Sequence, residues 1–370
     1  MAIEIADKKI GDNAPCFIIA EVGINHNNDL EIAKKLIDSA ADAGCDAVKF
    51  QAFKASKMYP VSAGKLKWKD KEKEYSYDIF KSNKLYEIPN NWWPKLYKHA
   101  KSKNLVFFAS VCDENSADEF SKYIEIFKTT SFAITHLPLL KHIAKKGKPI
   151  MFSTGTATMP EVKEAYDAVK ALNKDIMILH CISEYPAPAK STNLVTINLL
   201  KEKFPDAVIG FSDHSEDIDK VPVSAVVYGT KIIEKHITLD RKMKGPDHFF
   251  ALEPEMLKKM VANIRKAEKD IEDGKKILID PVLIGKKARS LTESEKYLRK
   301  FARRSVMTKK ALKKGHILQK DDIIVLRNGK KEQGLAPKWY DIISDGSYML
   351  TKDVEKEHPI KEKDIKEIDK

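Results

Sequence analysis

Between about residue 16 and residue 270, short apolar runs alternate eight times with amphipathic segments of helical spacing. Eight strand–helix repeats in about 250 residues predict a (β/α)8 TIM barrel. A doubly wound sheet is the alternative, but no Gly-x-Gly-x-x-Gly turn follows the first run. The predicted strands are residues 17–20, 47–50, 106–109, 124–127, 149–152, 176–179, 208–211 and 232–234.

The length of 370 residues predicts a second, smaller unit beside the barrel. We expect the barrel domain over residues 1–275, a lysine-rich linker over 276–297 and a small β-rich domain over 298–370. Residues 54–94 form a long, charged and aromatic insertion after the second predicted strand. In a barrel it would lie on the catalytic face, either as a lid or as a packing excursion.

Composition excludes several classes of protein. No apolar run approaches the length of a membrane span, and the amino terminus lacks a signal segment, so we expect no membrane partner. The four cysteines are scattered without a Cys-x-x-Cys pair, which predicts buried free thiols and a cytoplasmic location.

The net charge of +12 comes mainly from lysines that are interleaved with acidic residues along the whole chain. A nucleic-acid-binding patch would be clustered and richer in arginine, so we expect no nucleic-acid partner. A basic mouth that attracts an anionic substrate stays compatible with this composition.

Polar side chains follow every predicted strand, and parallel strands of a barrel bring their carboxyl ends to one rim. Two of these side chains are the imidazoles of His214 and His236, which suggest a divalent metal with open coordination sites. The alternative is a pair of hydrogen-bonded structural histidines. Lys49 lies inside a strand and predicts an anion ligand or a Schiff-base nucleophile, unless it is an edge lysine facing solvent.

Nine short stretches of the chain form a specific set of motifs: 19–27 (IAEVGINHN), 47–51 (AVKFQ), 152–155 (FSTG), 179–181 (LHC), 184–188 (EYPAP), 210–214 (GFSDH), 234–236 (EKH), 245–248 (GPDH) and 252–254 (LEP). Together they resemble the N-acetylneuraminate (sialic acid) synthase family. This family includes legionaminic and pseudaminic acid synthases and spore-coat polysaccharide relatives. The carboxyl-terminal stretches 304–306 (RSV), 313–315 (KKG) and 321–323 (DDI) resemble the antifreeze-like SAF domain of these enzymes.

The resemblance implies condensation of phosphoenolpyruvate with an open-chain N-acyl hexosamine, with release of phosphate. It places manganese or magnesium on His214 and His236, and it implies a domain-crossed homodimer in which Arg327 reaches the partner's active site. The implied phosphoenolpyruvate ligands are Lys49, Ser110, Lys128, Ser131, Ser153, Ser183 and Ser212. The implied catalytic residues are Glu21, His214, His236 and Asp247, and the implied acceptor-sugar ligands are Glu21, Gln51, Tyr185, Asp247 and Arg327.

Three departures from the family pattern concern the acceptor. Residues 131–133 read Ser-Phe-Ala where many sialic acid synthases read Ser-Gly-Glu. Residues 247–250 read Asp-His-Phe-Phe in place of Asp-His-Lys, and 109–112 read Ala-Ser-Val-Cys in place of Ser-Thr-Pro-Phe. We therefore expect a more apolar acceptor pocket, open to mannosamine, a bacillosamine-derived sugar or another hexose. The alternative functions are a Schiff-base aldolase using Lys49 and a non-catalytic sugar-binding relative.

Overall fold

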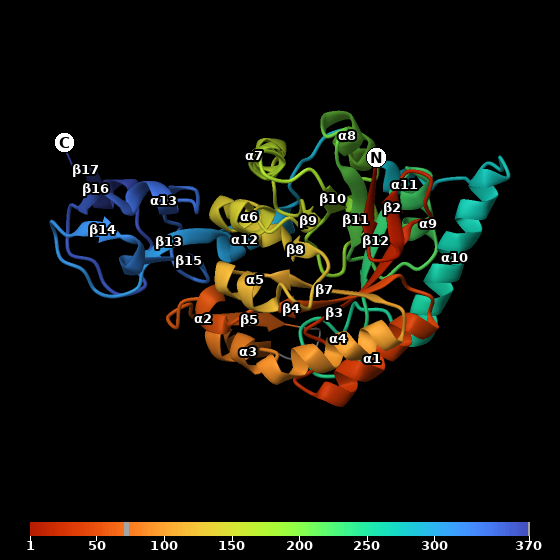
Figure 1. Cartoon of the computed structure of the whole chain (residues 1–370), viewed down its shortest axis with the longest axis horizontal. Helices are drawn as coiled ribbons and strands as arrows, with labels where there is room; N and C mark the ends of the chain where they lie inside the picture. Colours follow the sequence, from red (N-terminus) through yellow and green to blue (C-terminus); the bar gives the residue numbers. More distant parts are fainter. Residues whose placement is uncertain (70–73, 369–370) are drawn as a thin grey trace.

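The computed structural model describes residues 1–69 and 74–368. Eight parallel strands close into a barrel in the order β10-β11-β12-β3-β4-β7-β8-β9, which confirms the predicted TIM barrel (Figure 1). The strands are β3 (Phe17–Gly23), β4 (Ala47–Ala52), β7 (Val106–Val111), β8 (Phe127–Thr129), β9 (Ile150–Ser153), β10 (Ile176–Cys181), β11 (Val208–Asp213) and β12 (Ile232–His236).

Strand β8 differs from its predicted range of 124–127. Ile124 and Ile126 are buried, but ladder pairing begins only at Phe127, which lies opposite Ala109 of β7 and Ile150 of β9. The apolar pattern detects burial and not pairing, so it placed the strand three residues early. Lys128 thus lies within a strand, in a barrel whose interior is otherwise mostly apolar.

Amphipathic helices surround the barrel because each presents an apolar stripe to the strands. In α1, Leu36, Ile37 and Ala40 are buried, and Asp29 caps the helix by accepting hydrogen bonds from the amides of Glu31 and Ile32. The outer helices are α1 (Leu30–Asp42), α4 (Trp93–Ser102), α5 (Glu114–Phe120), α6 (Leu137–Ala144), α7 (Met159–Lys170), α8 (Val195–Lys203), α9 (Lys220–Val227) and α10 (Pro254–Glu272).

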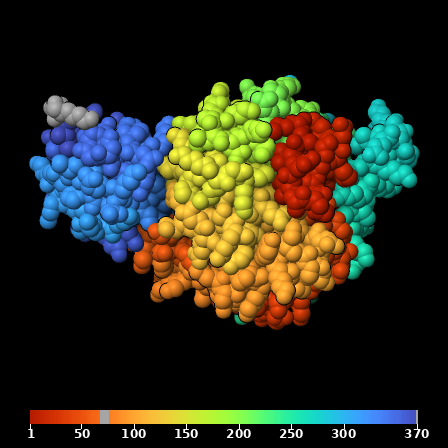
Figure 2. Space-filling model, in the orientation of Figure 1, coloured from red at the N-terminus to blue at the C-terminus, as the bar shows by residue number. Residues whose placement is uncertain are grey.

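Two additions frame the barrel. The amino-terminal hairpin of β1 (Ala2–Ile5) and β2 (Lys8–Gly11) packs its isoleucines on the barrel core. The amino-terminal segment is the red region on the surface in Figure 2. The predicted insertion folds as α2 (Ala55–Met58), the β5–β6 hairpin (Lys65–Lys69 and Glu74–Asp78), α3 (Ile79–Leu85) and the 3-10 turn η1 (Asn90–Trp92).

The carboxyl-terminal part forms a lobe at one end of the molecule, shown in blue in Figure 2. Its strands form a two-stranded and a three-stranded sheet around a hydrophobic cluster separate from the barrel core. The chain reaches this lobe through α11 (Pro281–Ile284) and α12 (Glu293–Ala302). The strands are β13 (Arg304–Thr308), β14 (Ile317–Gln319), β15 (Ile323–Arg327), β16 (Asp345–Leu350) and β17 (Ile365–Glu367), with the short helix α13 (Trp339–Ile343).

The cysteine prediction is confirmed, since all four cysteines are free and buried. Among the described residues, no helix combines the length and the apolar character needed to cross a membrane.

Candidate active site

A cavity of about 370 Å³ opens at the carboxyl ends of the barrel strands. Twelve of the fourteen predicted site residues line it; Ser110 and Ser183 lie just behind its wall. The insertion and α12 supply the remaining walls. The lining predicted residues are Glu21, Lys49, Gln51, Lys128, Ser131, Ser153, Tyr185, Ser212, His214, His236, Asp247 and Arg327.

A cluster of buried charges forms the floor of the cavity. Lys49 Nζ lies 2.6 Å from Glu21 Oε2 and 3.5 Å from Glu234 Oε2, and Lys128 Nζ lies 4.0 Å from the same Glu234 oxygen. All four side chains are at most 5% exposed. The inward orientation of Lys49 therefore agrees with an anion ligand and excludes a solvent-facing edge lysine.

The two carboxyl groups of this cluster have opposite pKa shifts. Burial raises the pKa of Glu21 to about 7, in spite of the neighbouring ammonium of Lys49. For Glu234, burial also favours the neutral form, but Lys128 and Lys49 together outweigh it and lower its pKa to about 2. The carboxylate of Glu234 thus balances part of the lysine charge when no anion is bound.

Serine hydroxyls surround the two ammonium groups. Lys49 Nζ donates to Ser110 Oγ at 3.1 Å, and Lys128 Nζ donates to Ser153 Oγ at 2.6 Å. Ser212 Oγ donates to Glu234 Oε1 at 2.9 Å. Ammonium groups and hydroxyls in such proximity are suited to binding a phosphate or a carboxylate.

The remaining two predicted serines meet at Gly155. The Gly155 amide donates to Ser131 Oγ at 3.1 Å, while Ser183 Oγ is buried without a hydrogen-bond partner. A Cβ on Gly155 would collide with Ser183 Oγ and would lie 2.7 Å from Ser131 Oγ and 3.0 Å from Cys181 Sγ, so only glycine fits. The structure thereby brings the Ser131 and Ser183 hydroxyls together in a polar recess at the Gly155 backbone.

His214 and His236 lie side by side, with ring centroids 5.4 Å apart. His214 Nδ1 is 2.9 Å from the carbonyl of Ile182, which leaves its Nε2 available. His236 Nδ1 is buried without a partner and lies 4.0 Å from Asp247 Oδ2. Two such imidazoles fit an open metal site, because catalytic metals keep positions for water or substrate.

No complete metal site of three or more His, Cys, Asp or Glu side chains is present within residues 1–69 and 74–368. A bound ion would therefore need water or substrate oxygens in addition to the two histidines. Phe250 packs against both rings, with centroids 5.0 Å from His236 and 6.3 Å from His214, and Tyr185 lies 5.4 Å from Phe250. This apolar support fixes the ring planes.

Arg327 of β15 enters the cavity from the carboxyl-terminal lobe. Its Nη1 lies 3.3 Å from the hydroxyl of Tyr59. The resemblance implies that this arginine completes a partner's site, but here it lies in the cavity of its own chain. The homodimer itself stays a prediction.

Several lining residues were not predicted as site residues. Glu234 has a usable signal, because a strand alternates its faces and the inward His236 implies an inward Glu234 two residues earlier. Tyr59, Leu66 and Tyr77 of the insertion and Phe301 of α12 also line the cavity. Their spacing carries no signal, because they reach the cavity only through tertiary packing.

Known proteins resemble this chain along most of its length. Residues 36–276 match the NeuB family. The spore coat polysaccharide biosynthesis protein SpsE of Bacillus subtilis is 43% identical over 347 residues, 93% of this chain and 92% of that protein. Its crystal structure covers 100% of both chains with a TM-score of 0.88 and 41% identity. The N,N'-diacetyllegionaminic acid synthase of Campylobacter jejuni is 38% identical over 314 residues, 84% of this chain and 90% of that enzyme.

Proposed function

Because this chain belongs to the NeuB family of enzymes, we propose that it condenses phosphoenolpyruvate with the aldehyde of an open-chain N-acyl hexosamine. The products are a nonulosonic acid and inorganic phosphate. The observation that carries the proposal is the pairing of two recognition sets in one cavity. Lys49, Lys128 and Ser153 line the same cavity as His214 and His236.

Phosphoenolpyruvate carries a phosphate and a carboxylate, and both need positive charge and hydrogen-bond donors. Lys49 and Lys128 would supply the positive charge. The bound anion would replace Glu234 as the ion-pair partner of the two lysines. The unpartnered Ser183 hydroxyl, next to Ser131, supports a phosphate in the recess at Gly155.

His214 and His236 would hold manganese or magnesium, and a bound divalent ion would polarise the aldehyde oxygen of the acceptor. The orphaned Nδ1 of His236 and the oriented ring of His214 support this role. Phe250 would keep both rings in place while substrates enter.

The proposed reaction has two stages. The methylene carbon of phosphoenolpyruvate forms a bond to the aldehyde carbon, whose oxygen takes up a proton. Water then adds to the cationic centre left on the phosphoenolpyruvate carbon, and phosphate departs with carbon–oxygen cleavage. Glu21 and Asp247 both face this space, and either carboxylate can relay the protons.

The acceptor would lie toward the insertion and α12, beside Gln51, Tyr185 and Arg327. Phe132 takes the place next to the position where many relatives carry a glutamate, and its ring faces Arg327. An apolar wall with few carboxylates favours acceptors that bear acyl or deoxy groups. We further propose that the carboxyl-terminal lobe is a SAF-type domain whose role is to bring Arg327 to the acceptor.

A Schiff-base aldolase requires a neutral lysine. Burial alone would lower the pKa of Lys49, but Glu21 and Glu234 outweigh burial and raise it. The amine is therefore held as an ammonium, which favours anion binding over nucleophilic attack.

Phosphate release tests the proposal. The protein is incubated with phosphoenolpyruvate, manganese or magnesium and, in turn, N-acetylmannosamine, a bacillosamine-derived diacetamido sugar and other N-acyl hexosamines. We expect release with at least one acceptor, and its loss in a chelator, in His214→Ala and in His236→Ala. Activity that survives the chelator, or trapping of pyruvate by borohydride, would instead favour the aldolase. No release with any acceptor would favour a sugar-binding role.

A further inference from the structure

A buried ion pair lies behind the cavity wall, and the proposed reaction does not use it. Arg289 Nη2 is 2.6 Å from Glu295 Oε1, with the two side chains 1% and 0% exposed. Neither residue lines the cavity. A buried pair by itself adds little to stability, because the loss of hydration offsets the attraction between the charges. The backbone contacts of the two side chains therefore decide what the pair does.

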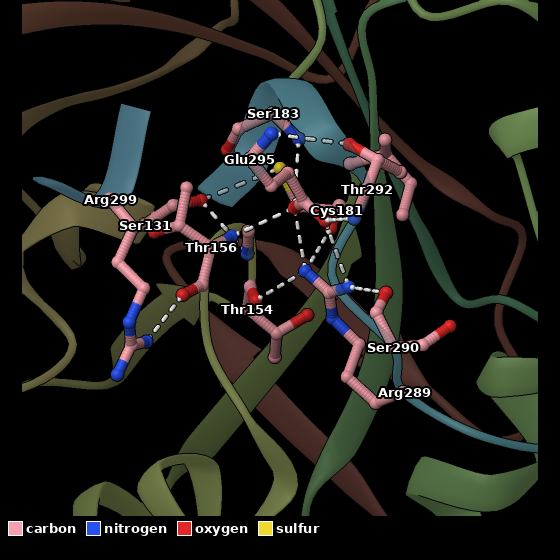
Figure 3. Close-up of polar contacts among 12 residues, drawn as sticks. Ser131, Thr154, Thr156, Cys181, Ser183, Arg289, Ser290, Thr292, Glu295 and Arg299 are labelled. Atoms are coloured by element: carbon pink, nitrogen blue, oxygen red, sulfur yellow. Dashed lines mark hydrogen bonds and ion pairs between the residues drawn. The ribbon is translucent and has the colours of Figure 1, made fainter. Parts of the chain in front are cut away.

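The carboxylate of Glu295 joins two loops of the barrel (Figure 3). Its Oε1 accepts a hydrogen bond from the amide of Thr156 at 2.8 Å and another from the amide of Ser183 at 3.2 Å. Thr156 lies in the loop after β9, and Ser183 follows β10. Burial would raise the pKa of Glu295, but the bonds from Arg289 outweigh it and lower the pKa, so the group is a carboxylate at neutral pH.

Arg289 joins the same two loops through their carbonyl groups. Its Nη2 donates to Thr154 O at 3.1 Å and to Cys181 O at 3.4 Å. Since β9 ends at Ser153 and β10 at Cys181, the strand ladder does not extend along these loops. Arg289 and Glu295 thus supply hydrogen-bond donors and acceptors to the backbone groups of these loops, for which the barrel strands supply few.

Thr156 is held on its other side as well. It has a left-handed backbone with φ of 57°, which is unfavourable for a residue other than glycine. Its carbonyl accepts hydrogen bonds from Arg299 Nη1 and Arg303 Nη2, both at 2.8 Å. Such a conformation persists only where the surroundings over-determine it. Glu295 and the two arginines provide that constraint from α12 and its end.

The two joined loops carry the recess described above. Ser183 belongs to one loop, and Gly155, whose amide holds Ser131, belongs to the other. Ser131 itself lies in the 3-10 turn η2 (Ser131–Ala133), and its Oγ contacts both sides, since it accepts from the Gly155 amide and donates to Cys181 Sγ at 3.4 Å. A change in the distance between the loops would therefore shift the Ser131 hydroxyl relative to that of Ser183. An error of an ångström in such a distance is enough to weaken binding strongly.

We propose that Glu295, held by Arg289, is a positioning residue that sets the spacing of the phosphate-binding serines from outside the cavity. The inference rests on the proposed function, because it assumes that this recess takes the phosphate of phosphoenolpyruvate. It also makes α12 a shared element, which seats the carboxyl-terminal lobe and shapes the donor site in the barrel.

The test is the Glu295→Gln variant, which keeps the size of the side chain and removes its charge. We expect the KM for phosphoenolpyruvate and the inhibition constant of inorganic phosphate to rise at least about tenfold, with the acceptor KM changed less than about twofold. Equal changes in both KM values, or none, would overturn the proposal. If Glu295→Gln does not fold, Arg289→Lys carries the same test, since lysine keeps the charge but cannot bridge both carbonyls.

Glu357→Gln is the matched control, because it makes the same substitution at another contact between the carboxyl-terminal lobe and the barrel domain. Glu357 accepts hydrogen bonds from the amides of Val61 and Ser62 in the insertion, and the variant leaves the bonds of Glu295 to Thr156 and Ser183 in place. We expect a lower Tm with an unchanged KM for phosphoenolpyruvate; a matching rise in this variant would reduce Glu295 to a general structural role. The parent protein is assayed first. An inactive parent would contradict the proposed function, whereas an active parent with a parent-like Glu295→Gln would contradict only the positioning role.

Discussion

The guanidinium carbon of Arg327 lies 5.0 Å from the ring centroid of Phe132 and 5.5 Å from that of Tyr59. The arginine is thus held between two aromatic faces, which attract a cation without neutralising it. Its Nε is buried without a hydrogen-bond partner. The positive charge of Arg327 is therefore retained for a substrate.

We predict that Arg327→Ala impairs acceptor use more than donor use. Loss of a charged hydrogen bond to the substrate should raise the acceptor KM about tenfold or more, with little change for phosphoenolpyruvate. Initial rates of phosphate release at varied concentrations of each substrate measure both. A comparable loss for the two substrates would contradict the placement of Arg327 at the acceptor.

Subunit mixing tests whether Arg327 acts in its own chain. Arg327→Ala and His214→Ala each impair one part of the cavity, and the structure supplies both parts from one chain. Co-refolding of the two variants should therefore restore no activity. Partial recovery of phosphate release would instead demonstrate the crossed dimer.

Glu234→Gln should lower the stability of the ligand-free protein and increase its stabilisation by phosphoenolpyruvate. Removal of the carboxylate leaves Lys49 and Lys128 with less compensating charge in a buried site, at a cost of about 3 kcal/mol. An anionic ligand would restore the balance. Thermal unfolding with and without phosphoenolpyruvate should show a lower Tm and a larger ligand-induced increase than in the parent. A parent-like increase would mean that the anion does not contact the lysines.

Gly155→Ala should damage the recess by overfilling it. The added Cβ would collide with Ser183 Oγ and Ser131 Oγ and would contact Cys181 Sγ, so we expect a stability loss of about 1–3 kcal/mol and weaker phosphoenolpyruvate binding. Combining it with Ser131→Ala removes one clashing hydroxyl and should recover part of the stability but not the affinity. Recovery of both, measured by urea unfolding and calorimetry, would exclude a binding role for Ser131.

Asp364 gives the carboxyl-terminal lobe an acid-sensitive contact. Burial favours its neutral form, but the ion pair with Lys352 and the hydrogen bond from His358, each at 2.8 Å, outweigh burial and lower its pKa to about 2. A depressed carboxyl pKa stabilises the fold above the ordinary value near 3.8, and this contribution is lost as the pH falls toward 2. Asp364→Asn should therefore lower the free energy of unfolding by about 2 kcal/mol at pH 7 and by less at pH 3.

Hydrogen exchange in residues 345–367 measures this cost within the lobe itself. Asp353→Asn is the control, because its pair with Lys313 is exposed and such pairs contribute little. A cost for Asp364→Asn that does not change with pH would contradict the ion-pair origin of the effect.

The sequence predicts the barrel because strand burial and helix amphipathicity are local properties that repeat eight times. It also predicts the inward His236 and Lys49, since period-2 alternation and the strand end fix where a side chain points. The same alternation would have identified Glu234. The displaced start of β8 shows the limit of this reasoning, because burial of Ile124 and Ile126 does not require ladder pairing.

Contacts between distant segments could not be predicted in this way. Arg289 and Glu295 lie in a polar, lysine-rich stretch that has the composition of a solvated linker. Their burial depends on backbone groups of Thr156 and Cys181, more than 100 residues earlier in the chain. The apolar walls from Leu66 and Tyr77 likewise arise only when the insertion folds over the barrel mouth.

The contacts of Arg289 and Glu295 also determine where this architecture can be recombined. A chimera that joins the barrel of one relative to the lobe of another at residue 275 would exchange Arg289 and Glu295 together with Arg327. A junction after residue 303 would keep Arg289 and Glu295 with their native loops after β9 and β10 and transfer only the lobe. Under the proposed function, acceptor preference could then diverge, in the laboratory or in evolution, without disturbing the phosphoenolpyruvate site.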